Sequence, residues 1–149
     1  MRVIVQRVKK ASVKVEGNIV ASIKQGYLLL VGFTHEDNSF IVKKVAEKIT
    51  NLRIFSDEND KMNLAIKEVK GEILSVSQFT LYGDVSGGRR PSFTSSAKAD
   101  KAKELYELFN EYLDKLEINT KSGIFQSYME VESINDGPVT VIIDSEDLK

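Results

Sequence analysis

The sequence has 149 residues, 42% of them hydrophobic, and a formal net charge of −1 at pH 7. This length and hydrophobic share predict a single domain, residues 1–149, with a core of its own. The chain has no cysteine, which excludes disulfides, thiol nucleophiles and thiolate metal sites. Its one histidine, His35, argues against a zinc site, because such sites usually need several His or Cys ligands. We therefore expect no metal and no cofactor.

No stretch of the sequence is typical of a membrane-spanning or secreted protein. The longest apolar run, Tyr27 to Phe33, is too short to span a bilayer. Charged residues stand where a signal peptide would need an apolar core; they are Arg2, Arg7, Lys9 and Lys10. We therefore expect a soluble, cytoplasmic protein without a membrane partner.

A net negative charge is not typical of a protein that binds long nucleic acid electrostatically. Two local basic groups remain as candidate RNA contacts. One is Arg89-Arg90, and the other consists of Lys98, Lys101 and Lys103. Each group is equally consistent with an ordinary solvated surface.

The first part of the chain predicts strands. Residues 2–8 alternate in hydrophobicity, and a second strand follows at 12–16. Gly17-Asn18 is a two-residue hairpin signal that leads into a third strand at 19–23. The unbroken apolar run at 27–31 predicts a strand that is covered on both faces.

Two amphipathic helices are expected further along. In the first, apolar residues recur at every fourth position: Ile41, Val45 and Ile49. Asp37 or Ser39 is the candidate N-cap of this helix. The second helix is expected from about Ala97 to Leu116.

The remaining elements are strands and one long loop. Strands are expected at 52–55, 72–81, 123–134 and 139–144, and the last two meet at an Asn-Asp-Gly-Pro turn. After a polar turn at 56–61, residues 62–64 are expected to return the chain towards the core. The loop at 85–96 is functional or disordered, since long loops in compact domains are usually one or the other. This mixed order predicts an α/β fold in layers, with the two helices over a sheet and a second sheet behind it.

The strand expected at 72–81 begins apolar and ends polar. Ser77, Gln78 and Thr80 place hydroxyl and amide groups where a strand would still bury side chains. Alternation sends Ser77 and Phe79 to one face and Gln78 and Thr80 to the other. Such a strand end costs free energy unless its polar groups bind each other or a ligand. The alternative is an edge strand whose polar side chains face water.

Two motifs resemble a known family. The strings at 77–83, Ser-Gln-Phe-Thr-Leu-Tyr-Gly, and at 135–140, Asn-Asp-Gly-Pro-Val-Thr, resemble the two signature motifs of the D-aminoacyl-tRNA deacylases, also called D-tyrosyl-tRNA deacylases. Further matching stretches follow the family's order at 1–8, 51–55, 61–64 and 88–94. The resemblance implies a layered α/β/β fold that pairs as a homodimer. It also implies hydrolysis of the ester between a D-amino acid and the 3′-terminal adenosine of tRNA, as well as of mischarged glycyl-tRNA.

Ester hydrolysis requires a positioned water, a proton acceptor and donors for the developing oxyanion. Thr80 is the candidate nucleophile, but no base lies near it in sequence, and an unactivated threonine is a poor nucleophile. His35 lies in a polar loop, so we expect it at the surface rather than in a triad. We therefore favour backbone N–H groups around Phe79 and Thr80 as oxyanion donors. The resemblance implies that the substrate's ribose 2′-hydroxyl helps to activate water.

The same resemblance suggests substrate contacts. Ser77 and Gln78 are expected to position the terminal nucleotide or the ester. Phe79 offers a face for adenine stacking, although a place in the core is at least as consistent with its position. Met129 lines the pocket or belongs to the core. The resemblance implies that Arg7 braces the Gly-Pro turn, and the alternative is a surface ion pair.

Gly137-Pro138 is expected to be a cis peptide that projects into the active site of the other subunit. A rigid main-chain wall of this kind would exclude L-side chains and admit D-amino acids and glycine.

Two other classes of function remain as alternatives. One is a non-catalytic nucleic-acid-binding module dominated by the loop at 87–90. The other is a pure assembly domain, in which the polar strand end would have no purpose.

Overall fold

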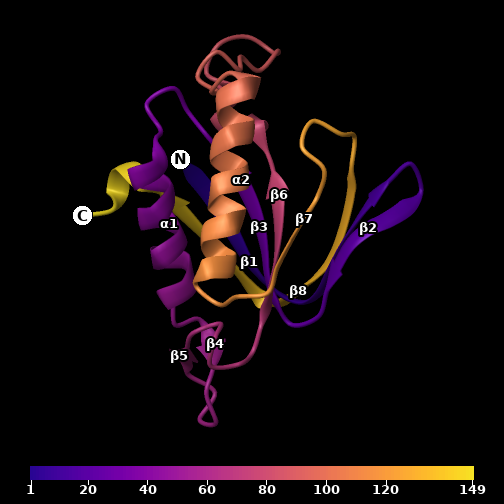
Figure 1. The fold of residues 1–149 in the computed structure, drawn as a ribbon, viewed down its shortest axis with the longest axis vertical. Helices are drawn as coiled ribbons and strands as arrows, with labels where there is room; N and C mark the ends of the chain where they lie inside the picture. Colours follow the sequence, from indigo (N-terminus) through magenta and orange to yellow (C-terminus); the bar gives the residue numbers. More distant parts are fainter.

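The computed structural model describes all residues from Met1 to Lys149. Its elements in chain order are β1 (Arg2–Val15), β2 (Asn18–Ile23), β3 (Gly26–Gly32), α1 (Ser39–Asn51), β4 (Phe55–Ser56), β5 (Met62–Leu64), β6 (Glu72–Ser77), the 3₁₀ helix η1 (Phe79–Tyr82), α2 (Ala99–Lys115), β7 (Thr120–Ser122), β8 (Glu130–Asp144) and the 3₁₀ helix η2 (Ser145–Asp147). Figure 1 shows α1 and α2 side by side over the sheet. No helix is long and apolar enough to cross a membrane.

The main sheet has six strands and is built around β1. One edge of β1 pairs with β8 along nearly its whole length, and β1 also pairs with β3 through its first half and with β2 through its second half, all antiparallel. β6 then joins β3 in parallel, and β7 joins β6 in parallel. The mixed sheet is therefore ordered β2-β1-β3-β6-β7, with β8 on the free edge of β1.

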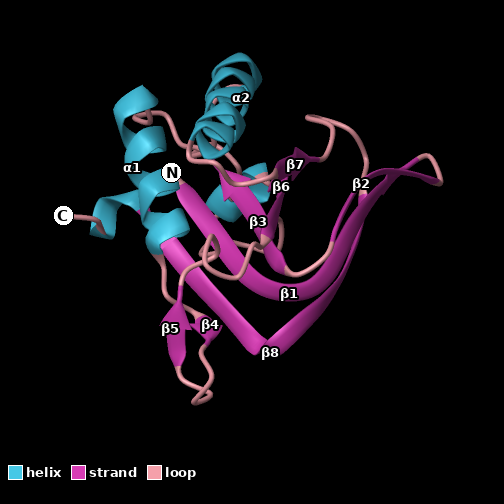
Figure 2. Ribbon diagram, turned by 60° about the horizontal axis from the view of Figure 1, so that its bottom comes forward, coloured by secondary structure: helices cyan, strands magenta, loops and turns pink.

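The sheet bends into two layers with a core on each side of β3 and β6. Alternate residues of β3 serve different cores: Tyr27, Leu29 and Val31 pack beneath the helices, whereas Leu28 packs on the opposite face. This confirms that the apolar run at 27–31 is covered on both faces. Figure 2 shows β1 and β8 bending sharply on the side away from the helices. The predicted α/β/β layering is confirmed, and the second β layer is a continuation of the same sheet.

The two helices agree with their periodicity, but the predicted cap of α1 was wrong. Asn38 is the N-cap, and its Oδ1 accepts from the N–H of Ile41 at 3.0 Å. Asp37 instead accepts from the buried N-terminal ammonium of Met1 at 2.6 Å and from the N–H of Thr34 at 2.7 Å. That buried charge pair takes the carboxylate away from the helix.

The predicted strand at 72–81 is also shorter than expected. β6 ends at Ser77, whose partner is Val31. β3 ends at Gly32, one residue after Val31, so β6 has no strand to pair with beyond Ser77. The chain then tightens into η1, where the N–H of Leu81 donates to the carbonyl of Gln78 at 3.2 Å. The strand alternation expected for Phe79 and Thr80 therefore does not apply.

The predicted turn between two closing strands is a bulge within one strand. β8 runs from Glu130 to Asp144 without reversing. Gln6 of β1 pairs with Thr140 and Val8 with Asn135, which leaves residues 136–139 without partners. The first part of the strand expected at 123–134, residues 123–129, is a loop, because pairing with β1 begins only at Glu130. Similarly, the strands expected at 2–8 and 12–16 are one strand, β1.

Candidate active site

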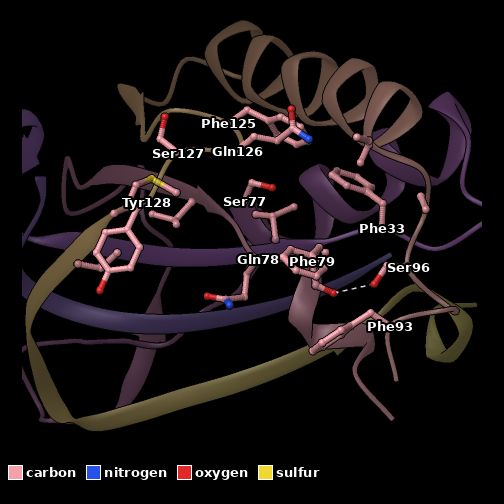
Figure 3. Close-up of a pocket in the computed structure, with 18 residues that line it drawn as sticks. Phe33, Ser77, Gln78, Phe79, Phe93, Ser96, Phe125, Gln126, Ser127 and Tyr128 are labelled. Atoms are coloured by element: carbon pink, nitrogen blue, oxygen red, sulfur yellow. Dashed lines mark hydrogen bonds between the residues drawn. The ribbon is translucent and has the colours of Figure 1, made fainter. Parts of the chain in front are cut away.

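The polar end of β6 opens into a cavity with a volume of about 670 Å³. One wall comes from residues 93–102 at the start of α2, and the other from residues 125–131 before and within β8. The floor is the ends of β3 and β6, with Ser77 and Gln78 (Figure 3). Ligand pockets typically fall between about 300 and 1,000 Å³, so this cavity has the size of a small-molecule site.

Ser77, Gln78 and Phe79 reach this cavity because the sheet ends beneath them. The N–H of Gln78 donates to the carbonyl of Val31 at 2.7 Å, which is the last main-chain hydrogen bond between this segment and β3. Beyond it, Phe79 is 56% exposed and belongs to neither core. The alternative that placed Phe79 in the core is therefore wrong.

Two main-chain donors at this point have no acceptor within the protein. The N–H groups of Phe79 and Thr80 begin the 3₁₀ helix η1, and no carbonyl or side chain accepts from them. The first amides of any helix lack an acceptor in their own helix. In this protein the two N–H groups lie next to the cavity, because Gln78 and Phe79 line it. Two adjacent free donors of this kind can hold a developing oxyanion.

Thr80 lies next to the cavity but has no base. Its Oγ1 accepts a hydrogen bond from the side-chain amide of Gln78, which cannot remove its proton. His35 is exposed, as expected, and its Nε2 contacts the carbonyl of Thr94 at 2.7 Å. His35 is not among the residues that line the cavity. The arrangement therefore lacks the nucleophile–base pair of covalent catalysis.

The walls of the cavity are aromatic, which the sequence had not revealed. Phe33, Phe93, Phe125 and Tyr128 line it together with Phe79. Phe79 and Phe93 meet edge to face with ring centroids 5.2 Å apart. Tyr128 is 90% exposed at the mouth of the cavity. The segment 125–128 is predicted as part of a strand, and that prediction gives no reason to place Phe125 and Tyr128 in a pocket.

Polar groups hold these walls in place. The hydroxyl of Ser96 donates to the carbonyl of Phe79 at 2.9 Å and so joins one wall to η1 (Figure 3). Behind the other wall, the Tyr106 hydroxyl donates to the carbonyl of Ser75 at 2.7 Å, and the Tyr106 ring lies 5.9 Å from that of Phe125. Burial raises the pKa of Tyr106, which keeps this phenol neutral and a hydrogen-bond donor. Met129 also lines the cavity while packing against the smaller core.

The Gly137-Pro138 bond is cis, as predicted, and lies in the β8 bulge rather than in the cavity. Arg7 lies opposite it and is 8% exposed. Its Nε donates to the carbonyl of Asp136 at 3.0 Å, and its Nη1 donates to the carbonyl of Ile54 at 2.8 Å. Arg7 also makes an ion pair with Asp136, with Nε 3.7 Å from Oδ2. The expected ion pair therefore exists, but Arg7 is buried against the bulge and is not a surface residue.

Within one chain, this bulge lies far from the polar end of β6. Arg7 pairs with Tyr27 of β3, whereas Ser77 pairs with Val31 of β3. Four residues of β3 separate the two positions, or about 13 Å along the strand. Because of this distance, the predicted site residues form two groups: residues 77–80 with Met129 at the cavity, and Arg7 with Gly137-Pro138 at the bulge. No three His, Asp or Glu side chains come together anywhere in the molecule as a metal-binding group would.

Comparison with known proteins decides which family shares this arrangement. The family described as D-Tyr-tRNA(Tyr) deacylase matches residues 4–144. The chain belongs to this family. Curated D-aminoacyl-tRNA deacylases from Dictyoglomus turgidum and Exiguobacterium sibiricum are 56% and 55% identical to it. These alignments cover 100% and 97% of this chain and 96% and 99% of the relatives. The predicted family is thereby confirmed.

Solved structures share the fold. One described as "c-Myc DNA Unwinding Element Binding Protein" has a TM-score of 0.91 and 38% identity, over 97% of this chain and 98% of the other. Another, described as a probable eukaryotic D-amino acid tRNA deacylase, has a TM-score of 0.82 over 95% of this chain and 97% of the other. At 17% identity the second supports the fold alone. Both confirm the predicted deacylase-like fold.

Proposed function

We propose that the protein hydrolyses the ester bond of D-aminoacyl-tRNA and releases free D-amino acid and tRNA. Its family is named for this reaction, and its curated relatives carry the same name. The observation that carries the proposal is the pair of unpartnered N–H groups at Phe79 and Thr80 beside an aromatic cavity. Because the substrate is an intermediate of translation, we expect the protein to act in the cytoplasm.

The two N–H groups stabilise the oxyanion that forms when water attacks the ester carbonyl. Removing one preorganised donor of this kind typically costs about 10²–10³ in rate. Because the donors are main chain, their position depends on η1 and not on a side-chain rotamer. Gln78, whose amide contacts the Thr80 hydroxyl, then positions the ester or the terminal ribose.

The attacking water needs a proton acceptor, and the cavity contains no histidine, aspartate or glutamate. The ribose 2′-hydroxyl of the terminal adenosine lies next to the ester in the substrate itself. We assign the activation of water to that hydroxyl, so that the RNA supplies the group that the protein lacks. The aromatic walls would hold the adenine by stacking, as aromatic side chains do with unpaired bases.

Chiral selection is assigned to the β8 bulge of a second copy of the chain. Within one chain, Gly137-Pro138 is remote from the cavity, so a role at the ester requires a homodimer in which each bulge completes the other site. A wall of main-chain carbonyls would collide with an L-side chain and leave room for a D-side chain. Glycine has no side chain, so glycyl-tRNA would be accepted. Because no side-chain pocket is involved, many D-amino acids would be accepted as well.

One relative favours a second candidate function. The structure at 38% identity is named for binding a DNA unwinding element, which is consistent with a nucleic-acid-binding module without catalysis. This candidate gives no purpose to the free N–H groups beside the cavity. Incubation with D-tyrosyl-tRNA distinguishes the two, since only the deacylase releases D-tyrosine and leaves L-tyrosyl-tRNA intact.

The experiment that tests the mechanism uses a tRNA ending in 2′-deoxyadenosine and charged with D-tyrosine. The protein should bind this substrate and turn it over very slowly compared with the normal one. Competition against normal D-tyrosyl-tRNA controls for binding. Undiminished turnover would show that a protein group activates the water.

A further inference from the structure

The segment at 85–103, which lies beside the cavity, is strongly basic. Residues 85–103 contain five basic residues and one acidic residue, Asp100, which gives a net charge of +4. The basic residues are Arg89, Arg90, Lys98, Lys101 and Lys103. Since the whole chain has a net charge of −1, the rest of it carries −5. Residues 2–14 of β1 also contain five basic residues and no acidic one, but two of them, Arg2 and Arg7, make ion pairs.

Most of the basic charge of residues 85–103 is free. Arg89, Arg90, Lys98 and Lys103 are exposed, and none makes an ion pair or a side-chain hydrogen bond. They therefore remain available to an anionic partner.

The segment has a defined place above α2, at the top of Figure 1. The main chains of Asp84 and Ser92 exchange hydrogen bonds at 2.7 and 2.8 Å, which closes the loop at its base. The Thr34 hydroxyl donates to the carbonyl of Ser95 at 2.6 Å, and the Lys101 ammonium donates to the carbonyl of His35. Exposed side chains are thus carried on an anchored backbone.

The same segment forms one wall of the cavity, through Phe93, Ser96, Ala97, Ala99 and Ala102. The opposite wall, residues 125–131, has no basic residue. Met129 and Val131 line the cavity, so Glu130 between them points to the other face of the strand, where Lys14 is its neighbour in the β1–β8 register. The cavity therefore has basic charge on one side only.

We propose that residues 85–103 form a phosphate-binding rim, which receives the RNA backbone of the 3′ end and acceptor stem of tRNA where it leaves the cavity. This inference rests on the proposed function, because it assumes that the cavity holds the terminal adenosine. Phosphate contacts carry no sequence information, which suits a protein that acts on many tRNAs.

The test measures the binding of uncharged tRNA at increasing KCl concentrations. In Arg89→Gln/Arg90→Gln, the slope of log K against log salt should fall by about 1.4 to 1.8, which is about 0.7 to 0.9 for each phosphate that the protein no longer neutralises. Affinity at about 0.1 M salt should fall by roughly tenfold or more. Both arginines are exposed, so an unchanged melting temperature will show that the variant is folded. The reversal Arg89→Glu/Arg90→Glu should weaken binding further.

The matched control is Lys48→Gln/Lys115→Gln, which removes the same charge from exposed positions in the last turns of α1 and α2. These turns lie at the opposite end of the helices from the rim, and α2 alone is about 25 Å long. The control should keep the wild-type slope. An equal loss in both double variants, or an unchanged slope in the arginine variant, would overturn the rim, as would a preference for duplex DNA over tRNA.

A separate measurement isolates the proposed function. Wild-type protein is incubated with D-tyrosyl-tRNA and with the D-tyrosyl ester of adenosine, which has no phosphates. Release from neither substrate would refute the proposed function. The salt dependence of binding to uncharged tRNA would still test the rim. If both are hydrolysed, the preference for the tRNA substrate, measured as a ratio of kcat/KM values, should fall about tenfold in Arg89→Gln/Arg90→Gln.

Discussion

The hydroxyl and the main chain of Thr80 have different roles in the proposed reaction. The N–H is an oxyanion donor without a partner in the protein, whereas the hydroxyl accepts from the Gln78 amide and has no base. Thr80→Ala removes only the hydroxyl and should retain activity within about tenfold of wild type, measured as single-turnover release of D-tyrosine. Thr80→Val, which keeps the volume, is the control. An acyl group trapped on Thr80, or a loss of about four decades as expected for a triad nucleophile, would contradict this.

Gly137 illustrates how one residue connects fold and selectivity. Its φ of +132° is a conformation that other residues rarely adopt, and an added Cβ would lie 2.8 Å from Val139 Cγ2 and 3.0 Å from Arg7 Nη2. Gly137→Ala should cost about 1–3 kcal/mol of unfolding free energy, which most domains tolerate. The displaced bulge should lower the ratio of D- to L-tyrosyl-tRNA turnover.

The control for Gly137 is Gly17→Ala in the β1–β2 turn. Gly17 also has a positive φ, +80°, but an added Cβ there would meet nothing within 4 Å. Its stability should fall through the backbone conformation alone, and its D/L ratio should equal that of wild type. Denaturant unfolding and paired turnover assays measure both effects. An unchanged D/L ratio in Gly137→Ala would separate the bulge from chiral selection.

At the scale of elements, Arg2 joins three segments that are distant in sequence. From β1 its guanidinium binds Asp144 of β8, with Nε to Oδ2 at 3.0 Å, and donates from Nη1 to the carbonyl of Leu81 at 2.7 Å. It also lies over the Tyr82 ring, 4.7 Å from the centroid. The short helix that presents the oxyanion donors is therefore held by the end of the sheet.

Arg2→Met keeps the aliphatic stem and removes these contacts. We expect a loss of about 1 kcal/mol in unfolding free energy near pH 7, because the pair is partly exposed and screened by water. Since η1 would lose an anchor, kcat should fall more than KM rises. Thermal unfolding and steady-state kinetics give the two numbers, and unchanged kcat would show that η1 does not depend on Arg2.

The same pair predicts a pH dependence. Burial acts to raise the pKa of Asp144, but the Glu146 N–H and the Arg2 guanidinium outweigh it and hold that pKa below its ordinary value of 3.8. A carboxyl with a lowered pKa in the folded state stabilises the protein above its unfolded-state pKa and loses that contribution as the pH falls through the folded value. The stability difference between wild type and Arg2→Met should therefore be constant near neutral pH and shrink as the pH falls below 3.8. The part of the difference that comes from the Leu81 carbonyl and the Tyr82 ring should remain in strong acid, and a difference that does not shrink at all would exclude Asp144 as the partner.

At the scale of the whole molecule, β8 leaves a long edge and apolar side chains uncovered. It pairs only with β1, and Ile134 and Ile142 are 46% and 66% exposed. An unpaired strand edge of this length is a ready surface for a second chain. This agrees with the proposed homodimer, which predicts sedimentation at twice the mass of one chain.

Mixed dimers test whether the bulge acts on the partner's site. One chain carries Ser77→Trp, which fills its cavity, and the other carries Gly137→Ala. The single working site then lies in the second chain and faces the intact Gly137-Pro138 of the first. We expect wild-type D/L selectivity from this purified heterodimer.

In the control heterodimer, both substitutions are in the same chain. One chain is unsubstituted and provides the working site, and its partner carries Ser77→Trp and Gly137→Ala. The working site then faces a bulge that carries the substitution, so its selectivity should be reduced. The opposite result for the two heterodimers would place the bulge in the site of its own chain, and a monomeric protein would refute the proposed wall altogether.

Local pattern alone was sufficient to predict several parts of this protein. The run at 27–31, the helix positions Val45 and Ile49 and the hairpin at Gly17 follow from periodicity and turn chemistry, which depend on neighbours in sequence. The polar residues at 77–80 indicated a binding site at the end of β6, because polar groups at a strand end need partners. The family match rested on the order of short motifs, which is also a property of the sequence.

Tertiary contacts decided the rest. β6 stops at Ser77 because β3, its partner, ends at Gly32, and the N-cap of α1 is Asn38 because Asp37 is engaged by the N-terminus. The aromatic walls of the cavity come from segments near 33, 93 and 125 that only folding brings together. In each case the outcome depends on a partner far away in sequence, whose position no local periodicity encodes.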